Sequence, residues 1–217
     1  MERYALLLAA GYLIGSTPFG LYVSRYGRGG PSAGPANGNV APLDLYRRSG
    51  PARRLVGLAF ILELAKGFVP TLTGYVALGT PGAVGGGSAV LVGHNFPLFA
   101  RLRGSNSLAP LLGVLLAVYP LVVVILGMVG TAALSAWRYA SLAALVAAVV
   151  SPFALAALDA GGDYEGLVVL AAVLWSLLTF LAHRENIRRL VSGREARINA
   201  PALDGRGEAR RGGRRVR

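Results

Sequence analysis

Long hydrophobic segments alternate with short polar stretches along the 217-residue chain. A straight helix needs roughly 20 apolar residues to cross a bilayer core, and the segments 4–23, 55–78, 141–158 and 167–182 approach that length with few charges. The segments lack the alternating pattern of half-buried strands. The pattern therefore predicts an all-α, polytopic integral membrane helix bundle.

Shorter hydrophobic segments complete the bundle. One runs from about residue 88 to 100, after an uncharged stretch, 79–87, that is expected to form an outer turn. The nearly unbroken apolar sequence that follows divides at Pro120 and at Trp137–Tyr139. This division predicts helices over about 108–118, 121–136 and 141–158, and about seven helices in total.

Charge predicts how the bundle is oriented. The net charge is +12, and the connection 25–54 carries six arginines against Asp44 alone. Because cytoplasmic loops are enriched in Lys and Arg, the loops 25–54 and 101–107 are expected inside. The N-terminus is then outside, and the C-terminus is cytoplasmic. Asp159, Asp163 and Glu165 fall outside in this arrangement, as the charge rule expects.

The chain is expected to form one membrane domain, residues 1–198, followed by a basic cytoplasmic tail, residues 199–217. The tail has no hydrophobic periodicity and is predicted to be disordered. Such a tail is more typical of a membrane anchor than of a nucleic-acid-binding segment, so no nucleic acid is expected as a partner. No prediction of oligomeric state follows.

The sequence gives no sign of a metal or cofactor site. The chain has no cysteine, which excludes disulfides and thiolate ligands. His94 and His183 are expected on separate loops without a carboxylate-rich ligand set. Neither a metal nor a cofactor is therefore predicted.

The polar stretch 183–190 directly follows the last hydrophobic segment. On a helix that continues from that segment, His183 shares a face with Ile187, and Arg184 shares another with Arg188. The stretch fits either a basic anchor at the lipid headgroups or a functional site at the membrane surface.

Three more polar features have two interpretations each. Ser16 and Thr17 either bond back to their helix or face a site. The glycine-rich stretch 29–39 is either a linker or a cradle of backbone amides for a phosphate. Glu63 and Lys66 share a helix face and can pair within the membrane, structurally or in a functional cavity.

Four blocks of the sequence together resemble those of the bacterial PlsY-type acyl-phosphate:glycerol-3-phosphate acyltransferases, and the resemblance runs from residue 4 to about residue 198. The similar blocks are Gly15–Gly20, Glu63–Gly67, Gly93–Phe99 and His183–Leu190, the last with Gly193 and Glu195. Their order and spacing carry the resemblance, since any one block is common.

The two other motifs of that family are altered in this chain. In the first, Asn39 and Arg47 match, whereas Asn37, Leu43 and Asp44 differ. In the second, Asn106 stands in place of a lysine, and Ser105 and Ser107 stand in place of glycines.

The resemblance implies transfer of a fatty acyl group from acyl phosphate to the 1-hydroxyl of glycerol 3-phosphate, giving lysophosphatidic acid for phospholipid synthesis. It implies a multi-pass protein of the bacterial inner membrane, in contact with membrane lipids, with its active site facing the cytoplasm. His183, Asn186 and Arg47 are then the candidate catalytic residues. The candidate substrate- and phosphate-binding residues are Gly38, Asn39, Arg101, Arg103, Gly104, Asn106, Arg188 and Ser16.

An alternative is a catalytically impaired relative that binds lipid precursors or partner proteins. The changes at Asn37, Asp44 and Asn106 are the reason to consider it.

Overall fold

The computed structural model of the chain describes residues 1–19, 22–23, 53–100, 107–158 and 165–198. These residues form helices and no strand, in agreement with the predicted all-α fold. The α-helices are α1 (Glu2–Ser16), α4 (Arg53–Asn95), α5 (Leu108–Val118), α6 (Pro120–Trp137), α7 (Ala140–Leu158), α8 (Glu165–Ala182) and α9 (Arg184–Val191), with a short 3-10 helix, η2 (Leu98–Ala100).

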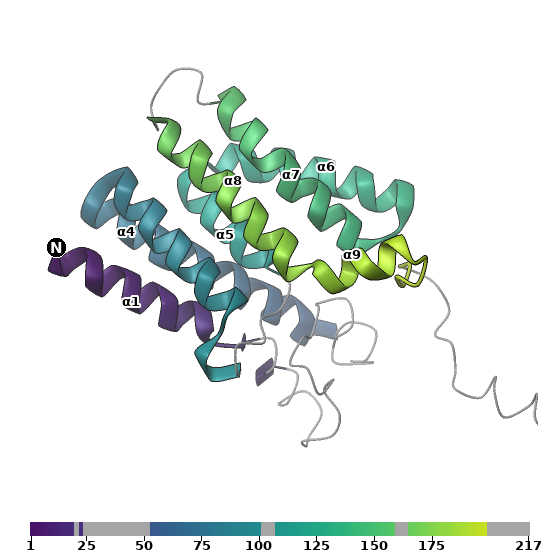
Figure 1. Cartoon of the computed structure of the whole chain (residues 1–217), viewed down its shortest axis with the longest axis horizontal. Coiled ribbons are helices and arrows are strands. Elements are labelled where there is room, and N and C mark those ends of the chain that lie inside the picture. The colour runs from purple at the N-terminus through teal and green to yellow at the C-terminus, as the bar shows by residue number, and fades with distance from the viewer. Residues whose placement is uncertain (20–21, 24–52, 101–106, 159–164, 199–217) are drawn as a thin grey trace, which may run out of the picture.

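α5, which is short and apolar, packs against α4, α6 and α8. α1 lies along α4, α6 pairs with α7, and α8 packs against both α7 and α4 (Figure 1). The core includes Leu111 and Leu115 from α5, Leu91 from α4 and Trp175 from α8, all of them fully buried. The Trp175 indole donates to Ser88 Oγ at 2.9 Å, which satisfies the one polar atom of that ring.

α4 folds back on itself at Gly79. This residue has φ 67° and ψ −156°, a region that only glycine adopts readily. The outer turn predicted over 79–87 is wrong in extent, because residues 80–95 are already helical. Pro81 permits this, since proline suits the first turn of a helix, where its missing N–H is not needed. The predicted span 55–78 thus lies in the first limb of α4, whereas the predicted span 88–100 is wrong in extent, because the second limb ends at Asn95 and η2 follows it.

The first predicted span, 4–23, ends early. α1 stops at Ser16, and Thr17 is extended with φ −76° and ψ 117°. Pro18 explains the break, because a proline disfavours helical backbone in the residue before it. The predicted span 4–23 is therefore wrong in extent, because α1 ends at Ser16.

The three helices predicted between residues 108 and 158 are confirmed by α5, α6 and α7. Pro120 begins α6, as the division assumed. α6 ends at Trp137, and its C-cap residue Arg138 closes the helix in the left-handed conformation with φ 61°.

The expectation that the helix continues through residue 183 is wrong. α8 and α9 meet at His183 and are bent by 62°. The spacing of the polar residues is still helical, so Arg184 and Arg188 keep the same row on α9. The bend turns α9 away from the direction of α8 (Figure 1).

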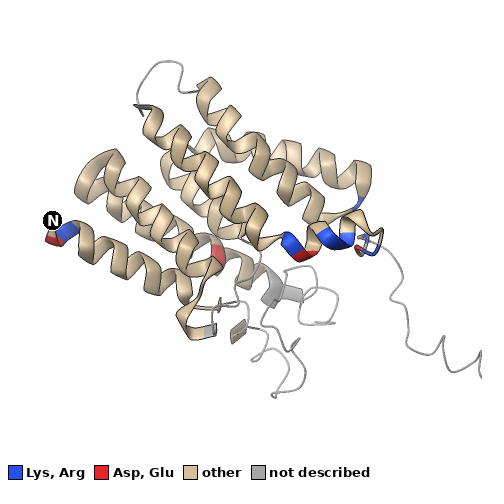
Figure 2. Cartoon of the chain, viewed as in Figure 1, with Lys and Arg blue, Asp and Glu red and all other residues tan. Residues whose placement is uncertain are grey.

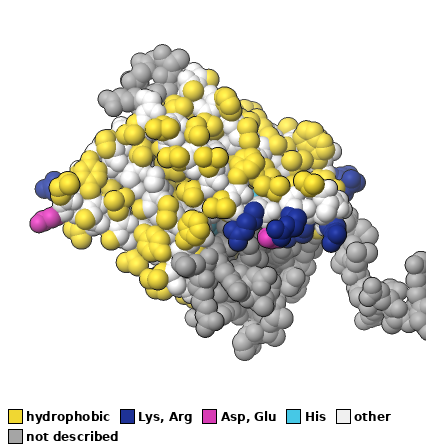
Figure 3. All heavy atoms as spheres, in the orientation of Figure 1, with side chains coloured by type: hydrophobic (Ala, Val, Ile, Leu, Met, Phe, Trp, Pro, Cys, Tyr) yellow, Lys and Arg dark blue, Asp and Glu magenta, His cyan; other side chains and the backbone are white. Residues whose placement is uncertain are grey.

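The surface is that of a membrane protein. Three helices of the described part are long and apolar enough to cross a bilayer, or four if α8 and α9 form one broken span. Charge gathers on α9, while α6, α7 and α8 are uncharged over most of their length (Figure 2). Hydrophobic side chains cover most of the visible face, and basic ones follow its edge (Figure 3).

The predicted orientation remains a prediction, as does the disorder of the tail. The tail, residues 199–217, lies outside the described residues, as does most of the loop 25–54.

Candidate active site

His183 sits at the junction of α8 and α9, where it is the N-cap residue of α9 and only 1% exposed. Its Nδ1 lies 2.8 Å from the carbonyl oxygen of Thr179, one helical turn earlier. A carbonyl can only accept, so Nδ1 carries the proton of this bond. In the neutral ring, Nε2 is then the nitrogen with the free lone pair, and His183 can act as an acceptor at a fixed orientation.

Thr179 in turn connects His183 to α5. Its hydroxyl accepts a hydrogen bond from Ser107 Oγ at 3.2 Å and donates to the carbonyl of Trp175 at 3.0 Å. Ser107 and Thr179 are both fully buried. Ser107, the N-cap residue of α5, has φ −89°, so a glycine is not required there. The serine that replaces a family glycine therefore has a structural partner in this chain.

Asn186 lies on α9, one turn after His183, and is 9% exposed. Its Nδ2 donates to Glu195 Oε1 at 2.9 Å. Because a carboxylate only accepts, this bond fixes which end of the amide faces Glu195. The amide oxygen of Asn186 is therefore presented away from the carboxylate.

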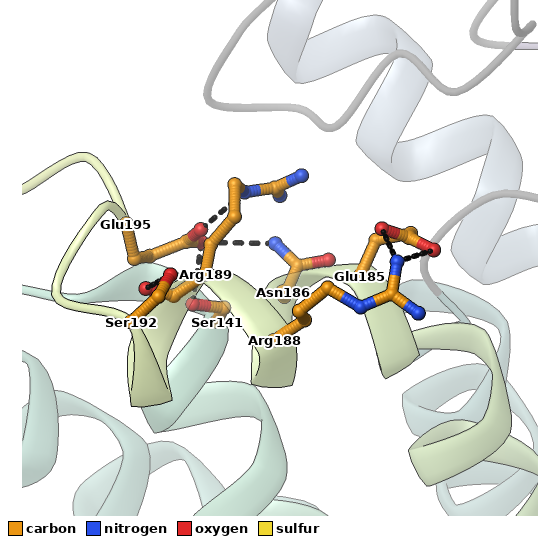
Figure 4. Close-up of polar contacts among 7 residues, drawn as sticks. All are labelled: Ser141, Glu185, Asn186, Arg188, Arg189, Ser192 and Glu195. Carbon is orange, nitrogen blue, oxygen red and sulfur yellow. Dashed lines mark hydrogen bonds and ion pairs between the residues drawn. The ribbon is translucent and has the colours of Figure 1, made fainter.

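The Glu195 carboxylate accepts hydrogen bonds from three side chains (Figure 4). Besides Asn186, Ser141 Oγ from the start of α7 donates to Oε1 at 2.7 Å, and Arg189 Nε donates to Oε2 at 2.6 Å. Burial by itself would raise the pKa of Glu195, but these hydrogen bonds and the Arg189 charge outweigh it and hold the pKa below its ordinary value. Glu195 therefore stays ionised and fastens α9 to α7.

Arg188, a predicted phosphate-binding residue, lies on the exposed side of α9. Its Nη1 is 3.0 Å from both carboxylate oxygens of Glu185. Figure 4 shows this pair separate from the group around Glu195. Its proposed contact with phosphate remains a prediction.

Ser16 lies at the end of α1 and is fully buried. Its Oγ has no hydrogen-bond partner among the described residues. The predicted pairing of Glu63 with Lys66 is confirmed: Lys66 Nζ lies 2.6 Å from Glu63 Oε2, and His94 Nδ1 lies 3.4 Å from the same oxygen.

The structure brings together only part of the predicted site. His183 and Asn186 sit one helical turn apart. Thr179 of α8 orients His183, and Glu195, which is bonded to Ser141 of α7, orients Asn186. The other candidates fall outside the described residues: Gly38, Asn39, Arg47, Arg101, Arg103, Gly104 and Asn106.

Sequence reasoning did not find the supporting residues Ser141 and Thr179, nor the role of Glu195. Ser141 begins an apolar stretch, and Thr179 lies in another that also contains Ser176, so nothing local marks either residue as a support. Among the described residues, no three His, Asp or Glu side chains form a group that could hold a metal ion.

Comparison with known proteins gives one consistent answer. The family model described as glycerol-3-phosphate acyltransferase matches residues 5–193. A glycerol-3-phosphate acyltransferase from Caulobacter vibrioides is 39% identical over 205 residues, covering 89% of this chain and 87% of the relative. One from Sinorhizobium fredii is 35% identical over 195 residues, covering 89% and 91%.

Solved structures agree. The crystal structure of PlsY, an integral membrane glycerol 3-phosphate acyltransferase, is 30% identical and covers 91% of this chain and 96% of its own. The TM-score is 0.78 for its glycerol 3-phosphate form and 0.81 for its lysophosphatidic acid form. These matches confirm the predicted resemblance and the membrane fold. The chain belongs to the integral membrane glycerol-3-phosphate acyltransferase family.

Proposed function

We propose that this protein transfers a fatty acyl group from acyl phosphate to the 1-hydroxyl of glycerol 3-phosphate. The relatives named above carry the matching activity in their names, and the two PlsY structures are of a glycerol 3-phosphate form and a lysophosphatidic acid form. The single observation in this chain that carries the proposal is the buried His183, oriented by Thr179 beside an Asn186 that Glu195 holds in place.

The reaction needs little covalent chemistry from the protein. Acyl phosphate is a mixed anhydride, so its acyl carbon is already activated. The glycerol hydroxyl oxygen bonds to that carbon, the bond from carbon to the phosphate oxygen breaks, and inorganic phosphate leaves. The hydroxyl gives up its proton in the process. Positioning and charge stabilisation then supply most of the rate.

His183 is suited to receive the attacking hydroxyl. With Nδ1 donating to Thr179, Nε2 of the neutral ring can accept a hydrogen bond. A glycerol hydroxyl can donate to Nε2, whereas an unprotonated phosphate oxygen cannot, because both atoms are acceptors. This argument favours contact with the hydroxyl over contact with phosphate, and a general-base role follows if the ring takes the proton.

Arginine is proposed to recognise the phosphates. Its guanidinium binds phosphate through two donors and keeps its charge at all relevant pH values. Arg47 is the main candidate, with Asn39 and Arg103 as further contacts. Arg101 and Arg103 also supply positive charge next to Asn106, where the lysine of the family is missing.

The reaction is proposed to take place at the cytoplasmic face of the bacterial inner membrane. The bend at His183 places the polar α9 next to the apolar α8, which is the arrangement expected where a water-soluble acceptor meets a lipid-embedded donor. The exposed hydrophobic helix faces offer a surface for the acyl chain and for membrane lipids.

The proposal is tested with purified protein, acyl phosphate and radiolabelled glycerol 3-phosphate. Labelled lysophosphatidic acid is expected with acyl phosphate, and acyl-coenzyme A serves as the comparison donor. Absence of labelled product from folded protein would overturn the proposed activity. Product with acyl-coenzyme A alone would overturn the proposed donor.

A further inference from the structure

A buried group of ionisable side chains joins α1 to both limbs of α4, and the proposed reaction does not use it. This group, the Lys66 cluster, comprises Glu63, Lys66 and His94. The Lys66 ammonium and the His94 ring both contact Glu63 Oε2, at 2.6 Å and 3.4 Å. The side chain of Lys66 is 1% exposed and that of Glu63 is 12% exposed. Lys66 Nζ also donates to the carbonyl oxygen of Thr17 at 3.1 Å.

Stability is a weak explanation for such a cluster. Removing an ion pair from water costs about as much as the pair regains, and apolar replacements are often neutral or stabilising. Ionisable groups inside membrane bundles are costly and usually serve function. The location of the cluster indicates which function.

The cluster sits beside the C-terminal ends of two helices, α1 and α4. Thr17 is the C-cap residue of α1, where carbonyl groups lack partners within the helix, and Lys66 supplies one. The chain runs from Thr17 toward residues 24–52, which contain Arg47. His94 stands at the end of α4, and the chain runs from there through η2 toward residues 101–106. One cluster therefore holds the starting points of both segments that carry the proposed phosphate-binding residues.

The cluster is also close to the candidate active site through α5. Gly67, next to Lys66, packs so tightly on the backbone of Pro110 that a Cβ at this position would overlap the Pro110 carbonyl. Pro110 is in the first turn of α5, three residues after Ser107, which bonds to Thr179. A displacement of Lys66 would therefore also displace the N-terminal end of α5, where Ser107 bonds to Thr179 and so supports His183.

We infer that Lys66 is a positioning residue for glycerol 3-phosphate binding. Lys66 bonds to Thr17 directly and is linked to His94 through Glu63. It thereby fixes the positions of Thr17 and His94, from which the two segments start, relative to His183. The inference rests on the proposed function, because the phosphate it serves is that of glycerol 3-phosphate.

The test compares three variants with the wild-type protein. Glu63→Gln with Lys66→Met removes both charges of the ion pair together. Lys66→Arg keeps the charge and the donor. Tyr119→Phe is the matched control, because the Tyr119 hydroxyl donates to the Leu158 carbonyl at 3.1 Å and ties two helices at the far end of α5.

The double variant is expected to raise the KM for glycerol 3-phosphate about tenfold or more, with a smaller change in kcat, since a hydrogen bond to a charged group is lost. Lys66→Arg should recover most of the wild-type KM, and Tyr119→Phe should leave it unchanged. A wild-type KM in the folded double variant, even with a lowered Tm, would reduce the cluster to a structural role and overturn the inference.

Calorimetric measurement of glycerol 3-phosphate binding separates this inference from the proposed function, because it does not require turnover. Wild-type protein that binds but does not react defeats the proposed activity, while a weakened Kd in the double variant still supports positioning. If the double variant does not fold, His94→Gln replaces it. A Kd raised about threefold supports the inference, as expected for loss of one weak contact, and an unchanged Kd overturns it.

Discussion

Ser107 illustrates how a departure from the family pattern is accommodated at the scale of one residue. Its hydroxyl donates to Thr179, whose carbonyl orients His183. Ser107→Ala should therefore destabilise the protein by about 1 kcal/mol and lower kcat/KM severalfold, because His183 loses part of its support. Ser135→Ala is the control, since that hydroxyl is exposed and donates to the carbonyl of Ala132 within α6. Equal kinetics in both variants would remove Ser107 from the support of His183.

Glu195 predicts a dependence of stability on pH. Its pKa in the folded protein is below the ordinary value of 4.5, so its stabilising effect is complete above pH 4.5 and is lost as pH falls through the lowered pKa. Glu195→Gln should lower the Tm at neutral pH, and the difference from wild type should shrink below pH 4.5, where the carboxyl takes up a proton.

Glu185→Gln provides the comparison for Glu195. The Glu185–Arg188 pair is exposed, and exposed pairs contribute little. The Tm of Glu185→Gln should match the wild-type value across the pH range. A constant Tm difference between Glu195→Gln and wild type at all pH values would contradict the role assigned to the Glu195 charge.

The residues of the site were only partly predictable. His183 and Asn186 stand out in the sequence because they interrupt a hydrophobic run at helical spacing. Their supports do not, since Ser141 is 54 residues from Glu195 and tertiary contacts between the start of α7 and the segment after α9 bring them together. A serine at the start of an apolar helix carries no such information.

At the scale of elements, the backbone at Gly79 decides the shape of α4. Gly79→Ala should destabilise the bundle by about 1–3 kcal/mol, because its φ and ψ are nearly exclusive to glycine. Gly57→Ala is the matched control in the same helix, where an added Cβ meets nothing within 4 Å and alanine favours the helix. Thermal unfolding in detergent measures both, and an equal Tm for the two variants would contradict the strained turn.

Helix positions followed from the sequence where proline or hydrophobic length marked them. Pro120 and the Trp137–Tyr139 stretch separated α5, α6 and α7 correctly. The bend at His183 was not predictable, because the polar residues after it keep helical spacing whether the helix bends or not. The turn at Gly79 was placed too broadly, since glycines of the second limb that allow close packing resemble glycines of a loop.

At the scale of the whole molecule, the orientation in the membrane can be tested directly, because the chain has no cysteine. Single cysteines at Ser32, Ser105 and Ser192 are predicted to lie in the cytoplasm. They should resist an impermeant thiol reagent in intact cells and react after lysis. A cysteine at Thr80, beside the turn of α4, is expected to react in intact cells. Labelling of Ser192→Cys in intact cells would reverse the predicted orientation.

The central claim is acyl transfer at the His183–Asn186 site, and a single assay tests it most directly. Lysophosphatidic acid and inorganic phosphate are measured together in reactions of wild type, His183→Ala and Asn186→Ala with acyl phosphate and glycerol 3-phosphate. The account predicts one phosphate released per lysophosphatidic acid in wild type, and a fall of about 100-fold or more for folded His183→Ala, with a clear loss for Asn186→Ala. Phosphate release without lysophosphatidic acid, or wild-type rates in both variants, would contradict it.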